Sequence, residues 1–186
     1  AMGDAVGRMY AEPYFPAAEK ARVQAIVANM VAAIIRRVER TTWMTAATRI
    51  RALAKLRGLY VGIGYPDHWQ DHSGLAVGPR DPIGNRRRAS AWRYRRALAR
   101  LGRPVDMTEW WIAPERAGAI LVFQQNAYDF SAALLQPPKY DPAAGTAAGD
   151  GAIGAVIGHD VTHYIDLLGA EYDVDGAVRH WWTPEV

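Results

Sequence analysis

The stretch Gly151-Ala-Ile-Gly-Ala-Val-Ile-Gly-His159-Asp-Val-Thr-His163 is glycine-rich, mostly apolar and ends in two histidines. With the apolar residues after it, it predicts a buried helix over 151–168 that Gly169 closes as a C-cap residue. Histidines four residues apart share one helix face, so His159 and His163 can reach the same metal ion. In so apolar a helix an unpaired imidazole carries a desolvation penalty, which favours metal binding. The alternative is a pair that hydrogen-bonds in a core without metal.

Acidic residues lie close to the two histidines in the sequence. Asp160 stands where the common form of this zinc motif has a glutamate as general base. Asp166, one further turn along, is expected to hold a histidine by its ring N–H from outside the metal's ligand set, and less readily to touch the metal. Glu171, Asp173 and Asp175 could supply a ligand from a loop, although acidic residues around a glycine more often form a solvated turn.

Composition limits the possible classes of protein. The chain of 186 residues is 50% hydrophobic and 22% charged, and it contains no cysteine, so any metal must be held by His, Asp or Glu. It is predicted to form a single globular domain over 1–186, in which folding buries about 70% of the unfolded surface. Nineteen arginines against three lysines suggest a bacterial genome rich in GC. Without an apolar run of about 20 residues, we expect no membrane span and a cytoplasmic location.

The remaining pattern predicts a mostly helical α+β protein. Apolar residues at three- and four-residue steps predict a helix over 17–40, and a second over 45–59 would complete a helical hairpin with Ile50, Leu53, Ala54 and Leu56 on one face. Glycines between 62 and 74 predict a loop. An arginine-rich helix is expected over 85–101, with a solvated or protein-contacting face more probable than a nucleic-acid groove. Two short adjacent strands are expected over 119–123 and 127–131.

Several ordered motifs carry a resemblance to a known family. The stretch ending at His163 resembles the zinc helix of the neprilysin and endothelin-converting-enzyme family of zinc metallopeptidases. Five further segments resemble other parts of that family, in the same order along the chain: Trp43-Met44, Ile63-Gly64-Tyr65-Pro66-Asp67-His68-Trp69, Leu101-Gly102-Arg103-Pro104-Val105-Asp106, Leu135-Gln136-Pro137-Pro138 and Trp181-Trp182-Thr183-Pro184-Glu185. The likeness covers nearly the whole chain. It implies part of a zincin catalytic lobe, with the zinc helix as the cleft floor and a short β element at the cleft edge.

The resemblance also shows departures from the family's pattern. Family enzymes have Glu where this chain has Asp160, and a carboxylate shortened by one methylene retracts by on the order of 1 Å, enough to weaken a base. The family's substrate-binding Asn-Ala pair falls on Gly118-Ala119, so the asparagine side chain is missing. Tyr164 replaces a small residue. The third zinc ligand of the family, a glutamate several dozen residues beyond the second histidine, lies past Val186, which we interpret as a truncation.

Three functions are compatible with these residues. In the first, His159 and His163 bind one zinc ion, Asp160 activates water, and Asp166, the 171–175 loop or a partner chain supplies the third ligand, with peptidase activity weakened or lost. In the second, the scaffold catalyses a non-proteolytic reaction on a small molecule in bacterial biosynthesis. The third is a non-catalytic binding protein. A small molecule or peptide would occupy the cleft, and exposed apolar surface predicts a homodimer or a complementary subunit. Neither nucleic acid nor membrane is expected as a partner.

Overall fold

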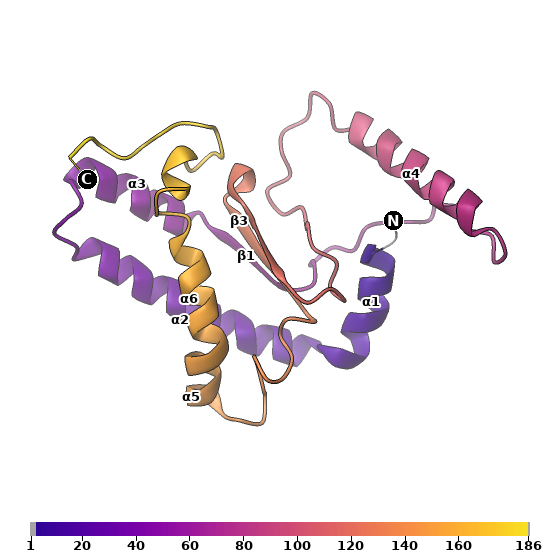
Figure 1. Cartoon of the computed structure of the whole chain (residues 1–186), viewed down its shortest axis with the longest axis horizontal. Helices are drawn as coiled ribbons and strands as arrows, with labels where there is room; N and C mark the ends of the chain where they lie inside the picture. The colour runs from indigo at the N-terminus through magenta and orange to yellow at the C-terminus, as the bar shows by residue number, and fades with distance from the viewer. Residues whose placement is uncertain (1–2, 186) are drawn as a thin grey trace.

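The computed structural model describes residues 3–185 and consists mainly of helices arranged around a small sheet (Figure 1). The regular elements, in chain order, are α1 (Gly3–Tyr14), α2 (Ala17–Glu39), α3 (Ala46–Arg57), β1 (Tyr60–Gly64), α4 (Pro82–Leu98), β2 (Ala119–Val122), η1 (Phe123–Gln125), β3 (Ala127–Ser131), α5 (Thr146–Gly149), η2 (Asp150–Gly154), α6 (Ala155–Thr162) and η3 (Gly169–Glu171). The mostly helical α+β class expected from the sequence is therefore confirmed.

Helices α2 and α3 form the expected hairpin. Thr45 caps α3, because its side chain accepts a hydrogen bond from the amide of Thr48. The predicted inner face of α3 is wrong in part. Ile50 is 69% exposed, and the residues that face the core are Thr48, Ala52, Lys55 and Leu56. A polar face is buried here because Lys55 donates to the carbonyl oxygens of Gly169 and Tyr172, at 2.7 and 2.5 Å.

The sheet has three strands in the order β1-β3-β2, with β3 in the centre. The predicted neighbours β2 and β3 pair antiparallel, whereas β1 runs parallel to β3. The loop predicted from residue 62 is wrong at its start, because residues 62–64 belong to β1. Gly62 is required in this strand because a Cβ there would stand 2.4 Å from both the Asp129 carboxylate and the Trp110 ring. Glycines that usually indicate a loop thus serve here for close packing.

The predicted final helix is displaced along the chain. Helical structure begins at Thr146, continues through a π-helical turn at Asp150–Gly154 and ends with α6 at Thr162. Gly169 is therefore not its C-cap residue. The chain turns after His163, and Gly169 begins the short helix η3.

Helix α6 and the turn before it pack closely against α2. A Cβ at Gly158 would lie 3.1 Å from the sulfur of Met30, and one at Gly154 would lie 3.3 Å from the terminal methyl of the same side chain. Ile153, Ile157 and Val161, each 0% exposed, complete the buried face. Gly154 and Gly158 therefore serve helix packing, while Gly151 has open space beside it. Across residues 3–185, no helix combines the length and the apolar character that crossing a bilayer requires.

Asp129 is an ionisable group inside the sheet. Its side chain is 0% exposed, one carboxylate oxygen accepts from the amide of Trp111 at 3.1 Å, and the other finds no hydrogen-bond partner among residues 3–185. Burial raises the pKa of Asp129 to about 6. The carboxyl group therefore keeps its proton in the folded protein at pH values where the unfolded chain releases it.

We predict that Asp129→Asn stabilises the protein at neutral pH. A folded-state pKa of about 6, above the unfolded value of about 4, means that wild type loses folding free energy as the pH rises between these values. The amide cannot ionise and still offers an oxygen to Trp111. Asp129→Asn should exceed wild type by about 2–3 kcal/mol above pH 7, with no such gain below about pH 4. Urea unfolding at both pH values measures this, and an equal difference at the two would contradict it.

Candidate metal centre

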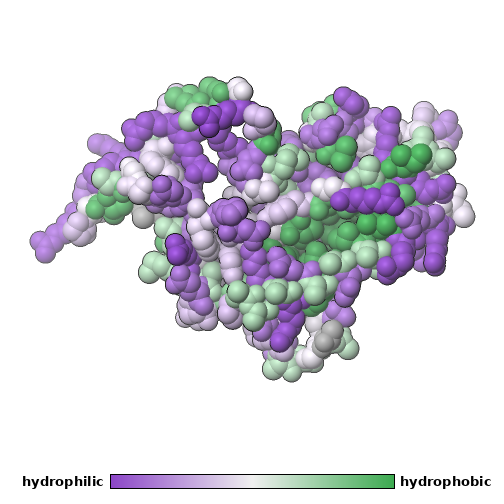
Figure 2. All heavy atoms as spheres, turned by 180° about the vertical axis from the view of Figure 1, so that it is seen from behind, coloured by the Kyte–Doolittle hydropathy of each residue, from purple (hydrophilic) through white to green (hydrophobic). Residues whose placement is uncertain are grey.

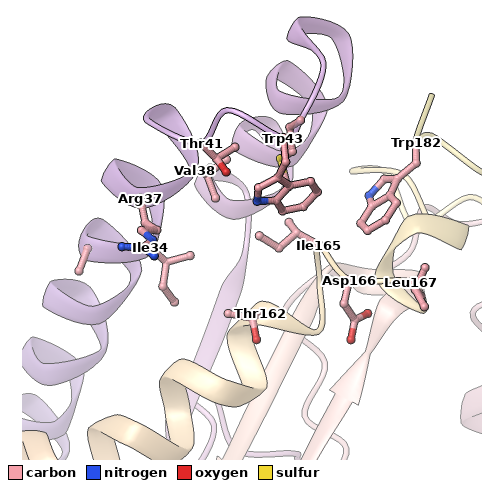
Figure 3. A pocket seen from close by; sticks show the side chains of 12 residues that line it. Ile34, Arg37, Val38, Thr41, Trp43, Thr162, Ile165, Asp166, Leu167 and Trp182 are labelled. Atoms are coloured by element: carbon pink, nitrogen blue, oxygen red, sulfur yellow. The ribbon is translucent and has the colours of Figure 1, made fainter. Parts of the chain in front are cut away.

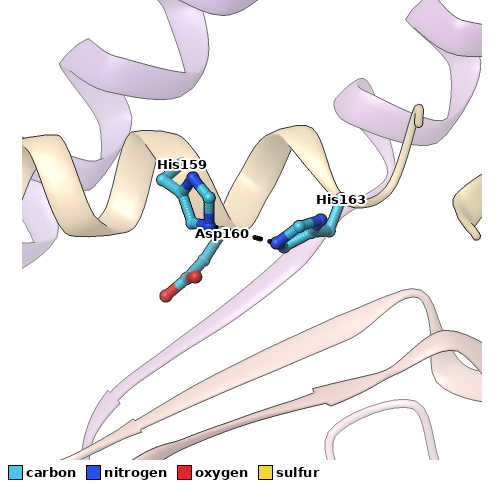
Figure 4. A group of neighbouring side chains, drawn as sticks. All are labelled: His159, Asp160 and His163. Atoms are coloured by element: carbon cyan, nitrogen blue, oxygen red, sulfur yellow. Dashed lines mark hydrogen bonds between the residues drawn. The ribbon is translucent and has the colours of Figure 1, made fainter.

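His159 and His163 lie one turn apart on α6 (Figure 4). The helical period places them on the side opposite the buried Ile157 and Val161. Their two Nε2 atoms are 3.2 Å apart, and the rings are nearly perpendicular, with centroids 4.8 Å apart. Both imidazoles thus present the same nitrogen to one point in space.

This spacing can be compared with the geometry of a zinc site. Zinc binds histidine nitrogen at about 2.0–2.1 Å with tetrahedral angles, which places two ligand nitrogens about 3.3 Å apart. The Nε2 atoms of His159 and His163 meet that requirement without any change of rotamer. The two residues therefore fit a zinc ion.

Asp166 holds His163 from behind. Its Oδ2 lies 2.6 Å from Nδ1 of the imidazole, while Oδ1 accepts from the amides of Leu168 and Gly169 at 2.9 and 3.1 Å. Burial raises the pKa of Asp166, but these hydrogen bonds outweigh it, so the pKa lies below its usual value and the group is a carboxylate. Because Nδ1 keeps its proton and donates it in a hydrogen bond to this carboxylate, Nε2 of His163 keeps a lone pair, as a metal ligand must.

Asp160 completes the group of side chains at this face. One ligand atom from each of His159, Asp160 and His163 lies within 4.8 Å of the other two, and among residues 3–185 no other set of three acidic or histidine side chains comes as close. The Asp160 carboxylate points toward the sheet (Figure 4) and accepts a hydrogen bond from the hydroxyl of Tyr128 on β3. It is placed beside the space that both imidazoles face, within reach through one water molecule.

The argument that burial favours a metal is not supported by the structure. His159 is exposed and His163 is only half-buried, so neither imidazole requires a metal to compensate for lost water. In a metal-free protein His159 can donate from Nε2 to the lone pair of His163. What favours a metal is the convergence of the two nitrogens and the carboxylate behind one of them.

The loop after α6 contributes no acid to the trio. Glu171 pairs with His180 at 3.0 Å, and Asp173 accepts from the backbone amides of Asp175 and Ala177. This matches the solvated turn that was the alternative expectation for these residues. A third protein ligand from Glu171, Asp173 or Asp175 is therefore not in place.

Gly118 and Ala119 lie where β2 begins. The amide of Gly118 donates to Oγ of Ser131 and its carbonyl accepts from the amide of Ser131, both at 3.1 Å, so this point is bound firmly to the central strand. Strand β2 pairs with β3 on one side only, and among residues 3–185 no strand lies beside its other edge. An extended peptide could add to that edge through backbone hydrogen bonds.

An apolar pocket of about 590 Å³ lies at the C-terminal end of α6 (Figure 3). Trp43 and Trp182 lie next to each other in its wall, in an edge-to-face contact with ring centroids 6.1 Å apart, and Asp166 also lines it. Trp43 is 59% exposed and Leu167 is 76% exposed. Viewed from behind, the half of the molecule that holds α2 and α3 shows an apolar area bordered by hydrophilic side chains (Figure 2).

Two tyrosines near the site were not predicted as functional from the sequence. Tyr128 contacts Asp160, and Tyr164 accepts from the amide of Val122 at 3.2 Å and donates to the carbonyl of Ala127. Both rings are buried, and a buried phenol requires a hydrogen-bond partner for its hydroxyl. A tyrosine within an apolar strand or helix is thus the signal that could have drawn attention to them.

Comparison with known proteins identifies relatives along the whole chain. Family models described as peptidase family M13 match residues 1–66 and 121–186. Human endothelin-converting enzyme-like 1 is 32% identical over 187 residues, covering 97% of this chain and 24% of that protein. The neutral endopeptidase of Lactobacillus helveticus is 34% identical, covering all of this chain and 29% of that protein. The chain thus spans about a quarter of the length of these curated relatives.

Solved structures agree with this result. The zinc metalloprotease ZMP1 of Mycobacterium tuberculosis in its open state is 44% identical with a TM-score of 0.87, over 99% of this chain and 28% of that one. PEPO from Lactobacillus rhamnosis is 33% identical with a TM-score of 0.88, over 98% of this chain and 29% of that one.

We predict that Asp166→Ala weakens zinc binding by about 10–100-fold, because loss of the Nδ1 partner frees the imidazole of His163 to rotate and change tautomer. Titration of the metal-free protein with zinc against a chelator of known affinity measures the effect. Asp175→Ala is the control, since Asp175 is exposed in the same loop region and belongs to no metal cluster. Equal affinities for the two variants would contradict the prediction.

Proposed function

Because this chain belongs to the neprilysin family of zinc metallopeptidases, peptidase family M13, we propose that its residues 151–166 form the metal-binding half of a zinc peptidase site. The observation that carries the proposal is the 3.2 Å separation of the His159 and His163 Nε2 atoms, with the Asp166 carboxylate fixed behind His163. A pair of surface histidines without a metal function needs neither feature.

His159 and His163 would hold the zinc ion. When bound in sites of this class, zinc polarises a carbonyl group and lowers the pKa of water to about 7. Asp166 keeps the proton of His163 on Nδ1, and the exposed face of α6 leaves the pair open to substrate. Each of these roles follows from the side chains themselves.

Asp160 would act as the general base. Its carboxylate lies beside the imidazole nitrogens, where it can take a proton from a water molecule that attacks a peptide carbonyl. Because aspartate is one methylene shorter than glutamate, the oxygen lies on the order of 1 Å short of the position a glutamate would reach, which reduces the rate. We therefore propose a peptidase site of weakened activity.

A peptide substrate would lie along β2. The free edge of this strand offers backbone amides and carbonyls to an extended chain, beginning at Gly118 and Ala119. The absence of an asparagine side chain at Gly118 removes one side-chain contact to the substrate backbone. Recognition would depend on main-chain pairing, and we expect low sequence selectivity and a high KM.

The third protein ligand would come from polypeptide outside residues 3–185, since within them no further acid or histidine joins the trio. That polypeptide, in the same chain or in a partner subunit, would pack on the apolar pocket lined by Trp43 and Trp182, whose wall includes Asp166 next to the site. Leu167 and Trp43 would then be buried rather than exposed.

We expect the protein, purified together with the polypeptide that supplies the third ligand, to contain about one zinc ion per chain, measured by elemental mass spectrometry. His163→Ala should lose most of it, because one nitrogen of the pair is gone. His68→Ala should retain it, since His68 is exposed and belongs to no metal cluster. A protein that folds without zinc and takes up none when zinc is added would contradict the proposal.

Asp160→Glu should raise kcat for a fluorogenic peptide by about 10–100-fold, because the longer side chain restores the reach of the base. Asp160→Asn should abolish hydrolysis while leaving zinc content unchanged. The expected pattern separates base function from metal binding. If Asp160→Asn hydrolysed the peptide as fast as wild type, Asp160 would not be the base.

A further inference from the structure

Tyr128 lies in the centre of the sheet directly below the candidate base. It is 1% exposed, and its strand β3 is paired on both sides, with Val61 and Leu121 as its register partners. The ring packs edge-on against Phe130 with centroids 4.1 Å apart. The hydroxyl therefore stands at a fixed point, and the group that accepts its hydrogen bond is Oδ2 of Asp160.

The helix that carries Asp160 is tied to the same sheet at a second point. Tyr164, 0% exposed, follows α6 and joins the amide of Val122 to the carbonyl of Ala127, two register partners at the end of the β2–β3 ladder. Tyr128 thus extends from the sheet to a residue of the helix, and Tyr164 extends from the end of the helix to the sheet. Together they fix the distance between α6 and the strand that a peptide would pair with.

Asp160 itself has little that would hold its carboxylate in one place. It is only half-buried, and Tyr128 is the partner that its carboxylate has among the described residues. An aspartate with one oxygen fixed retains a single free oxygen, whose direction is then determined by the sheet. A base gains from such fixation because proton transfer requires close alignment.

We infer that Tyr128 is the positioning residue of Asp160: its hydroxyl holds one carboxylate oxygen and leaves the other as the proton acceptor, in compensation for the short side chain. The inference rests on the proposed function for the base role, but the contact itself does not. Burial raises the pKa of Tyr128 above its usual value, so the phenol remains a neutral donor and does not compete with Asp160 for protons.

The chain contains a matched control for this pair. Tyr140, 3% exposed, donates from its hydroxyl to a carboxylate oxygen of Glu19 at 2.8 Å, away from the histidines. Tyr128→Phe and Tyr140→Phe therefore remove the same chemical group from two buried phenol–carboxylate pairs. A loss caused by packing or stability alone should appear in both variants.

The first test is the contact in the metal-free protein. With tyrosine labelled at the ring carbon that bears the hydroxyl, the resonance absent from Tyr128→Phe belongs to Tyr128. It should shift in Asp160→Asn, while the resonance absent from Tyr140→Phe should not. An unchanged Tyr128 resonance in Asp160→Asn would overturn the inference. This experiment needs no activity, and if Tyr128→Phe folds poorly, the contact of the Tyr128 ring with Phe130 can assign the resonance instead.

The second test is the role. Tyr128→Phe should lower kcat by about 10–100-fold with KM within about twofold, and Tyr140→Phe should leave kcat within about twofold. In the Asp160→Glu background, adding Tyr128→Phe should change kcat by less than about twofold, since the longer side chain reaches without help. An equal loss in both backgrounds, or an equal loss in Tyr140→Phe, would make Tyr128 a packing residue and overturn the inference.

The outcomes separate this inference from the proposed function. If every variant lacks zinc and hydrolysis while the Tyr128 resonance still responds to Asp160→Asn, the peptidase proposal fails, and the phenol is a structural tie rather than a positioning residue. If zinc and hydrolysis are present but Tyr128→Phe behaves like Tyr140→Phe, the peptidase proposal stands and only the role of Tyr128 is lost.

Discussion

The hydroxyl of Tyr164 stands between the amide of Val122 and the carbonyl of Ala127, at the end of the β2–β3 ladder. These two hydrogen bonds attach the end of the histidine-bearing helix to the strand pair that borders the site. Both backbone groups are buried, so leaving either one without a hydrogen-bond partner would lower the free energy of unfolding by about 1–3 kcal/mol. Where α6 lies, and therefore where His159, Asp160 and His163 point, depends on this attachment.

On the opposite side of α6, glycines rather than hydrogen bonds determine how closely the helix packs. Gly154 and Gly158 let the helix approach α2 until Met30 fills the remaining space. A larger residue at either position would push α6 toward the sheet, against the two phenols. The helix is thus held between close contact on one face and hydrogen bonds on the other, and its polar face is left to project its imidazoles outward.

Much of this arrangement could be predicted from local sequence. The apolar spacing of α2 and the shared face of His159 and His163 follow from a period of 3.6 residues, and the adjacent strands over 119–123 and 127–131 follow from short β-branched or aromatic runs. The elements that were mispredicted are those decided by distant residues. The sequence of β1 is typical of a glycine-rich loop. The residue that requires Gly62 is Asp129, whose side chain would clash with a Cβ there and which lies 67 positions later in the chain. Lys55 faces inward because its ammonium group donates to the carbonyl oxygens of Gly169 and Tyr172.

The site shows the same division. Spacing predicted the histidine pair, and the position of Asp166 suggested a supporting role, but nothing local relates Asp160 to Tyr128, 32 residues earlier on another element. His159 is exposed, so its imidazole contributes little to the packing of the helix. The core beneath α6 consists of Ile153, Ile157 and Val161, which pack without involving either imidazole. The helix therefore derives its stability from apolar burial, and the fold does not depend on the convergence of the two imidazoles.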